Sequence, residues 1–276
     1  MAIRDDQRPT LASWPRCIQA WEELPPPFRP ALEAWAAQGL PPQHVIHIPR
    51  VHQYAGGPEY AAAWWGDAVS LQTLRQGRLT GREIRPGETV QLRYQVRLLC
   101  CDVTAFLRDG SQVSFSYNKT REDQLLPLLN LLLGSPPDFR PAADHPETPE
   151  WAQLRRDSYA MYFTSLLCCR YGGPPRAHLW FRGRERSLVY FLRKMPQPEY
   201  FLAAADRGLV VLSTDFYGTR AVYLPWEEVR IAPPADGDAV LSITSAHGEG
   251  LSLPLLPGQA AQVRVFLQAA REAVPC

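Results

Sequence analysis

The densest cluster of basic side chains in the sequence is Arg182-Gly183-Arg184-Glu185-Arg186. A guanidinium group donates two parallel hydrogen bonds, a geometry that matches the oxygens of a phosphate. Trp180 and Phe181 precede the cluster, and aromatic rings among basic residues suit single-stranded nucleic acid. Three interpretations therefore stay open for Arg182, Arg184 and Arg186: a solvated hairpin turn, a site for an anionic ligand or lipid headgroup, and a nucleic-acid surface.

Histidine and cysteine residues could support a second kind of chemistry, metal binding or nucleophilic catalysis. His44, His47 and His52 lie close together, but His44 and His47 would point to opposite faces of a strand, and no Asp, Glu or Cys nearby completes a metal set. Four of the six cysteines form the adjacent pairs Cys100-Cys101 and Cys168-Cys169, whereas metal and redox motifs use spaced pairs. We therefore expect reduced, mostly buried thiols, with no metal and no cofactor.

Two adjacent tryptophans, Trp64 and Trp65, follow a run of three alanines. On a strand or a helix, one of two adjacent side chains tends to face outward. The pair could therefore bind a partner protein or pack one part of the chain against another, and both interpretations stay open.

The composition is that of a folded protein, with 46% hydrophobic and 21% charged residues. The net charge of +1 creates no field that would attract nucleic acid, so nucleic acid is not an expected partner. The charged N-terminus does not resemble a secretory signal, and no apolar run is long enough for a transmembrane segment, which together indicate a cytoplasmic protein. Because no Gly-rich phosphate loop, nucleophile elbow, HExxH or spaced CxxC motif occurs, we expect no catalytic residue.

The tripeptide Pro-Glu-Tyr occurs twice, at residues 58–60 and 198–200. Downstream, residues 86–92 (PGETVQL) and 225–231 (PWEEVRI) share Pro, Glu, Val and a final aliphatic residue at identical spacing. The sequence therefore predicts an internal duplication.

Each copy is expected to contain about seven short antiparallel strands followed by one amphipathic helix. Residues 90–98 alternate apolar and polar side chains, the two-residue period of a strand with one buried and one wet face. Asp109-Gly110 suits a tight hairpin turn. Further strands are expected at 103–107, 113–117, 178–181, 188–193, 209–212, 221–224, 229–231, 239–244 and 251–255, and helices at 11–23, 29–38, 124–133, 150–169 and 263–274.

The expected order of strands and a final helix resembles the pleckstrin-homology (PH) superfold in its bacterial PH-like and GRAM-like versions. The most similar part is residues 206–233 (DRGLVVLSTDFYGTRAVYLPWEEVRIAP). In those families two strands around a polar turn lead into a Pro/Trp-containing turn and an acidic residue before an aliphatic strand. The resemblance covers most of the second copy and is weaker in the first, where Gly87 stands in place of Trp226. It implies that the loop at Arg182–Arg186 holds phosphoinositide phosphates.

We therefore expect a mainly β, α+β fold: two PH-like units, each a bent antiparallel β-sandwich or partly open barrel capped by a C-terminal helix, plus extra N-terminal and inter-unit helices. An unrelated all-β sandwich or small barrel is the rival. The expected boundaries are an N-terminal helical extension (1–24), unit one (25–134), a Pro-rich linker (135–150) and unit two with a leading helix (151–276).

The expected function is that of a non-enzymatic cytoplasmic binding or scaffolding protein, with another protein as its partner. PH-like folds host many unrelated tasks, so this step rests on analogy. The alternatives are peripheral binding of an anionic lipid or phosphate ligand through the Arg182–Arg186 loop, and an enzyme with a Cys/His site at the cleft between the units.

Overall fold

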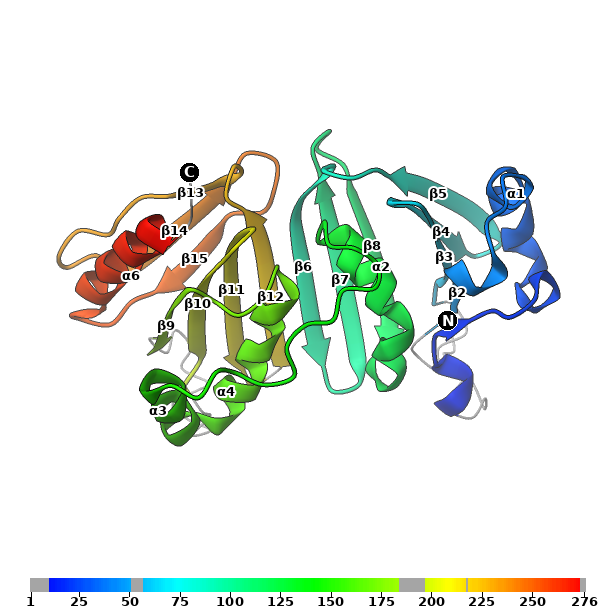
Figure 1. Cartoon of the computed structure of the whole chain (residues 1–276). Helices are drawn as coiled ribbons and strands as arrows, with labels where there is room; N and C mark the ends of the chain where they lie inside the picture. The colour runs from blue at the N-terminus through cyan, green and yellow to red at the C-terminus, as the bar shows by residue number, and fades with distance from the viewer. Residues whose placement is uncertain (1–9, 51–56, 184–196, 217, 274–276) are drawn as a thin grey trace, which may run out of the picture. The chain divides into compact units, whose positions relative to one another are not determined.

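The computed structural model describes residues 10–50, 57–183, 197–216 and 218–273 (Figure 1). The chain is mainly β with antiparallel sheets and belongs to the α+β class, as expected. It divides into two compact units. Unit 1 comprises residues 1–89, 98–105 and 112–139, and unit 2 comprises residues 90–97, 106–111 and 140–276. Residues 90–97 thus group with unit 2, although they were expected within a unit spanning 25–134.

Unit 1 contains a five-stranded sheet in the order β1-β2-β3-β4-β5. Its strands are β1 (Arg16–Cys17), β2 (Val45–Ile48), β3 (Glu59–Trp65), β4 (Ala68–Arg75) and β5 (Arg78–Ile84). The other main elements of the unit are α1 (Arg29–Ala37), most of β7 (Cys100–Leu107), β8 (Gln112–Asn118) and α2 (Leu126–Leu132). Ala61 and Ala63 of β3 are fully buried beneath an apolar cluster that includes Leu32 of α1 and Phe28, which directly precedes this helix. The N-terminal segment therefore covers one face of this sheet.

Unit 2 contains a run of five antiparallel strands in the order β9-β10-β11-β12-β6 and a separate sheet, β13-β14-β15. The strands are β6 (Thr89–Arg97), β9 (Ala177–Arg182), β10 (Glu199–Ala205), β11 (Gly208–Asp215), β12 (Gly218–Pro225), β13 (Val229–Ile231), β14 (Val240–Ser245) and β15 (Leu251–Pro254). Its helices are α3 (Pro149–Asp157), α4 (Tyr159–Ser165) and α6 (Gln259–Ala273).

The core of unit 2 lies between its two sheets and is closed by α6 (Figure 1). Val263, Phe266, Leu267 and Ala270 recur at helical spacing and are all buried against sheet residues such as Phe181. Each large apolar side chain of this kind stabilises the fold by about 1.5–3 kcal/mol when buried. The prediction of an amphipathic C-terminal helix that packs on a sheet is confirmed for these residues.

The hairpins β3–β4 and β4–β5 of unit 1 have the same register as β10–β11 and β11–β12 of unit 2. Across β3 and β4, Tyr60 pairs with Thr73 and Trp65 with Ala68. In the same way, Tyr200 pairs with Ser213 and Ala205 with Gly208 across β10 and β11. The following strands also match, because Arg75 pairs with Arg78 and Asp215 with Gly218. The two repeated tripeptides thus begin hairpins of identical register.

The helix expected over residues 11–23 is not formed as one helix. This segment contains two 3-10 helices, Thr10–Ser13 and Trp21–Glu23, separated by β1, which pairs with β2. Pro15 removes a backbone N–H that a continuous helix would need. The chain gains strand hydrogen bonds instead.

Other elements differ in their limits. The helix expected over 150–169 is broken at Ser158, whose extended backbone lies between α3 and α4. In unit 1 the helix starts at Leu126 after a 3-10 helix over Lys119–Leu125. The strand expected at 188–193 lies outside the described residues. Among the helices of the described part of the chain, none is long and apolar enough to cross a membrane.

Candidate ligand pocket of unit 2

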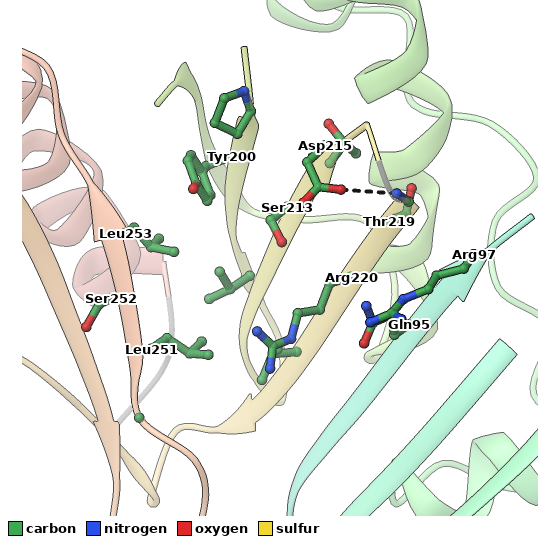
Figure 2. A pocket seen from close by; sticks show the side chains of 16 residues that line it. Gln95, Arg97, Tyr200, Ser213, Asp215, Thr219, Arg220, Leu251, Ser252 and Leu253 are labelled. Atoms are coloured by element: carbon green, nitrogen blue, oxygen red, sulfur yellow. Dashed lines mark hydrogen bonds between the residues drawn. The ribbon is translucent and has the colours of Figure 1, made fainter. Parts of the chain in front are cut away.

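A pocket of about 490 Å³ lies within unit 2, where one end of β10, β11 and β12 faces the beginning of β15 (Figure 2). It is lined by Gln95, Arg97, Pro198, Tyr200, Val211, Ser213, Thr214, Asp215, Gly218, Thr219, Arg220, Val222, Gly250, Leu251, Ser252 and Leu253. A volume of this size is within the usual range for small-molecule sites.

The polarity of the pocket follows from the side-chain alternation of its strands. On β12, Leu224 and Val222 belong to the apolar core, and Arg220 is the next residue on the same face. On β11, Val211 belongs to the core and Ser213 follows it on that face. The inner surface therefore changes from apolar in the core to polar at the strand ends, which leaves a polar pocket with an apolar floor.

Arg220 is the basic side chain that projects into this pocket (Figure 2). Leu251 and Leu253 face it from β15, whereas Ser252 points away. The Nη2 group of Arg220 donates to Glu249 Oε2 at 3.0 Å, and Arg93 Nη1 donates to the same oxygen at 2.6 Å. The Nε atom of Arg220 is buried and has no hydrogen-bond partner within the described part of the chain.

Arg97 contributes a second guanidinium at the β6 edge of the pocket (Figure 2). With its amide oxygen turned toward Arg97, Gln95 accepts from Nη2 at 2.9 Å and from Nε at 3.0 Å. Strand β6 is held beside β12 by the pairs Val96–Thr219 through Leu92–Tyr223, and this pairing brings both residues to the pocket.

The turn at the pocket rim depends on Gly218. Its φ of +150° is rarely adopted by residues with a side chain, and a Cβ at this position would overlap the carbonyl oxygen of Val96. Asp215 accepts a hydrogen bond from the Gly218 N–H at 3.1 Å (Figure 2). The absence of a side chain at Gly218 thus allows β12 and β6 to approach each other at the rim.

The matching positions of unit 1 carry different side chains. The cross-strand pair Ser213–Arg220 of unit 2 corresponds in register to Thr73–Thr80 of unit 1. Tyr60, the counterpart of Tyr200, is only 6% exposed, and its ring meets Phe115 edge-on at 6.4 Å. Unit 1 therefore has no arginine where Arg220 stands, and its tyrosine is buried.

The sequence predicts Arg182, Arg184 and Arg186 as candidate anion-binding residues. Arg182 follows Phe181 on β9; because Phe181 belongs to the core, Arg182 lies on the outer face of the sheet. Its guanidinium lies over the Trp180 ring at 5.3 Å, 3.8 Å from Glu199 Oε1, and donates to the Asp157 carbonyl at 3.3 Å. Arg184 and Arg186 lie outside the described residues, so their roles stay predictions.

The two tryptophans lie on opposite faces of β3. Trp64 is 6% exposed and stacks on His44, with ring centroids 4.7 Å apart. Trp65 is half-buried and packs against the cluster that contains Phe28. Both are therefore engaged within unit 1, and a protein partner for them stays a prediction.

The histidine and cysteine candidates are dispersed in the fold. His47 is buried 3.8 Å from Glu59, and His52 lies outside the described residues. Burial raises the pKa of Cys168 well above its ordinary value and that of Cys169 to about 11, so both are protonated thiols at neutral pH. Within the ranges that the structure describes, no group of three or more His, Cys, Asp or Glu residues could hold a metal ion.

A stack of aromatic rings joins the segment before α3 to the outer face of β9 and β10. Trp151 stacks on His145 at 3.6 Å and on His178 at 4.1 Å, and His178 stacks on Phe201 at 5.3 Å. His145 Nε2 lies 2.7 Å from the buried Ser165 hydroxyl. Burial lowers the pKa of His145 and lowers that of His178 to about 4, so both rings are neutral at pH 7. The arrangement fastens α3 and α4 to the sheet.

The sequence reasoning did not identify Arg97 and Arg220 as site residues. Arg97 was assigned to the wet face of a strand, and Arg220 was an isolated basic residue between two apolar runs. The available signal was the position of Arg220 two residues before Val222 on a strand whose inner face is otherwise apolar. A search of protein-family models gives no match to this chain, and a search of curated proteins gives no significant match.

Proposed function

We propose that this chain is a non-enzymatic cytoplasmic binding protein built from two PH-like units, and that unit 2 binds its ligand in the pocket at Arg220. The single observation that carries the proposal is this pocket, in which a partly unsatisfied guanidinium lies above an apolar floor. Polar groups that converge above apolar side chains are a feature of ligand sites.

The order of elements supports two PH-like units. In unit 2, β9 to β12 are followed by the three strands β13 to β15 and then by α6. In chain order β2 to β5 are likewise followed by three strands, β6 to β8, and then by α2. The identical hairpin registers at Tyr60 and Tyr200 favour a duplication as the origin of this order.

The state of the thiols bears on the alternative of an enzyme with a Cys/His site. The five cysteines among the described residues form no disulfide. The raised pKa values of Cys168 and Cys169 disfavour either as a nucleophile, because the thiolate is the reactive form.

An anionic group is the ligand chemistry that the pocket favours. Arg97 and Arg220 both line it, and a guanidinium binds phosphate or carboxylate oxygens through charge-assisted hydrogen bonds. Asp215 accepts from a backbone N–H of the rim, which uses part of its capacity as an acceptor. This proposal moves the anion site from the Arg182–Arg186 loop to the inner face of the sheet, since Arg182 already has Glu199 beside it.

Isothermal titration calorimetry with inositol hexakisphosphate as a probe tests this function. Replacing Ser213 by Trp should fill the pocket and abolish binding. The matched control is Ser242→Trp, because Ser242 is exposed on β14 and does not line the pocket. Equal binding by Ser213→Trp and the unmodified chain would place the ligand elsewhere, and absence of binding by the unmodified chain would contradict an anion-binding pocket.

A further inference from the structure

A carboxylate of the chain itself, that of Glu249, lies beside the pocket and is bound to the lining residue Arg220. Glu249 Oε2 lies 2.6 Å from Arg93 Nη1 and 3.0 Å from Arg220 Nη2. Its side chain is 41% exposed, so solvent and solutes can reach it. One exposed oxygen therefore serves two guanidinium groups.

This arrangement uses only part of the hydrogen-bonding capacity of Arg220. Arginine and an oxyanion commonly form two parallel bonds, but the bond to Glu249 involves Nη2. The buried Nε–H has no acceptor among the residues described here. A buried donor without a partner is costly, so a ligand that offers more acceptor oxygens would gain from it.

The backbone that carries Glu249 is fixed independently of its carboxylate. Gln91 Oε1 accepts from the Glu249 N–H at 2.6 Å, and Gln91 Nε2 donates to the Glu249 carbonyl at 3.3 Å. The preceding Gly248 permits this contact, because a Cβ there would overlap Gln91 Oε1. The side chain of Glu249 can therefore leave Arg220 while the turn stays in place.

Arg93 can remain the ion-pair partner of the Glu249 carboxylate after a ligand has displaced it from Arg220. It already forms the shorter of the two bonds to Glu249, and its guanidinium lies over the Phe106 ring at 5.7 Å. If an incoming anion takes Arg220, Glu249 keeps a charged partner in Arg93. The exchange therefore leaves neither carboxylate nor guanidinium without a counter-charge, which lowers its cost.

We propose that Arg220 is the receptor for an oxyanion of the ligand, phosphate in class, and that Glu249 is a built-in competitor that the ligand displaces from it. This inference rests on the proposed function of the pocket and adds the ligand class and the control of affinity. The same chemistry is offered by free phosphate compounds and by lipid headgroups.

The test compares Glu249→Gln with the unmodified chain in calorimetric titrations of inositol hexakisphosphate. Gln keeps the shape of Glu but is a weaker competitor, so the affinity should rise about 5- to 30-fold. Glu227→Gln is the matched control, since Glu227 is exposed and carries the same charge, whereas the carboxylate that pairs with Arg220 is that of Glu249. It should change the affinity much less.

A third variant separates the two proposals. Arg220→Thr places the unit 1 residue at this position and should weaken binding about tenfold or more. One possible result is that the unmodified chain binds inositol hexakisphosphate, Arg220→Thr does not, and Glu249→Gln binds no more tightly than the unmodified chain. This result would support the proposed ligand pocket but refute the role of Glu249 as a competitor. If neither the unmodified chain nor Glu249→Gln binds, both proposals fail. Circular dichroism and thermal unfolding establish that each variant is folded.

Two further probes identify the source of the oxyanion. Inorganic phosphate competes with inositol hexakisphosphate if a free anion is sufficient. Sedimentation with vesicles of phosphatidylcholine, with and without phosphatidylserine, tests a lipid headgroup. Glu249→Gln should bind each probe that binds at all more tightly than the unmodified chain does. If the two proteins bind every such probe with equal affinity, Glu249 is not a competitor.

Discussion

Acidification should loosen α3 and α4 from the sheet of unit 2, because His145 and His178 are held neutral in the stack around Trp151. Burial lowers the pKa of His178 to about 4, whereas a histidine in an unfolded chain has a pKa near 6.5. Below pH 6.5 the unfolded state binds a proton that the folded state does not. The stability that neutral His178 provides is therefore complete at pH 7 and declines as the pH falls.

The size of the effect follows from the two pKa values. At pH 5 the difference between pKa 6.5 and about 4 corresponds to a loss of about 2 kcal/mol relative to pH 7. The lowered pKa of His145 acts in the same direction. Asp144 and Glu150 also have lowered pKa values, because the Tyr162 and Thr148 hydroxyls respectively bond to them, but their contributions are lost only near pH 4 and below. The interval between pH 7 and pH 5 therefore isolates the histidines.

Hydrogen exchange measured by mass spectrometry on peptides covering α3 and α4 is the appropriate assay, since it reports on this segment alone. The protection factors of these amides, corrected for the intrinsic exchange rate, should fall by about 20- to 30-fold between pH 7 and pH 5. This fall reflects the change in the equilibrium between the closed and the open segment. His178→Phe keeps a ring between Trp151 and Phe201 but cannot be protonated, so it should lose most of this dependence. The same pH dependence in His178→Phe and in the unmodified chain would refute the reasoning.

Two other predictions concern unit 2. Phe266→Ala should lower the free energy of unfolding of unit 2 by about 3–5 kcal/mol, because Phe266 is 4% exposed in the contact between α6 and the sheets. A urea titration measures this loss, with Phe266→Leu as the milder control. A loss below about 1 kcal/mol would mean that α6 is not part of the core. Cys168 and Cys169 should react with iodoacetamide far more slowly at pH 7.5 than a free thiol, because their pKa values are raised, and rapid alkylation of either in the folded chain would contradict the described burial.

The strands that sequence patterns could predict are those rich in β-branched, aromatic and large aliphatic residues. The segments expected at 103–107 and 113–117 lie within β7 and β8, and those at 209–212 and 221–224 lie within β11 and β12. Strands β3 and β10 instead contain the alanine runs Ala61–Ala63 and Ala203–Ala205, which are fully buried. Alanine has a low strand propensity, so a run of alanines carries no local signal for a strand that is covered on both faces.

Strand β6 shows why the pocket could not be predicted. Its alternation placed Leu98 on the buried face and Gln91 on the wet face. In the structure Leu98 is 95% exposed in a turn with φ of +55°, and Gln91 is fully buried because it binds the backbone of Glu249. The pairing of β6 with β12 is a long-range contact, and alternation within one strand does not reveal which strand lies beside it.

The measurement that tests the account most directly is the NMR signal of the arginine Nε–H groups while inositol hexakisphosphate is added. The signal of Arg220, assigned from its absence in Arg220→Lys, should move more than any other as the unpaired Nε–H gains an acceptor. The signal of Arg182, which lies on the other face of the sheet beside Glu199, should stay unchanged. A shift of Arg182 with a stationary Arg220 would contradict the account and return the ligand to the loop that follows β9.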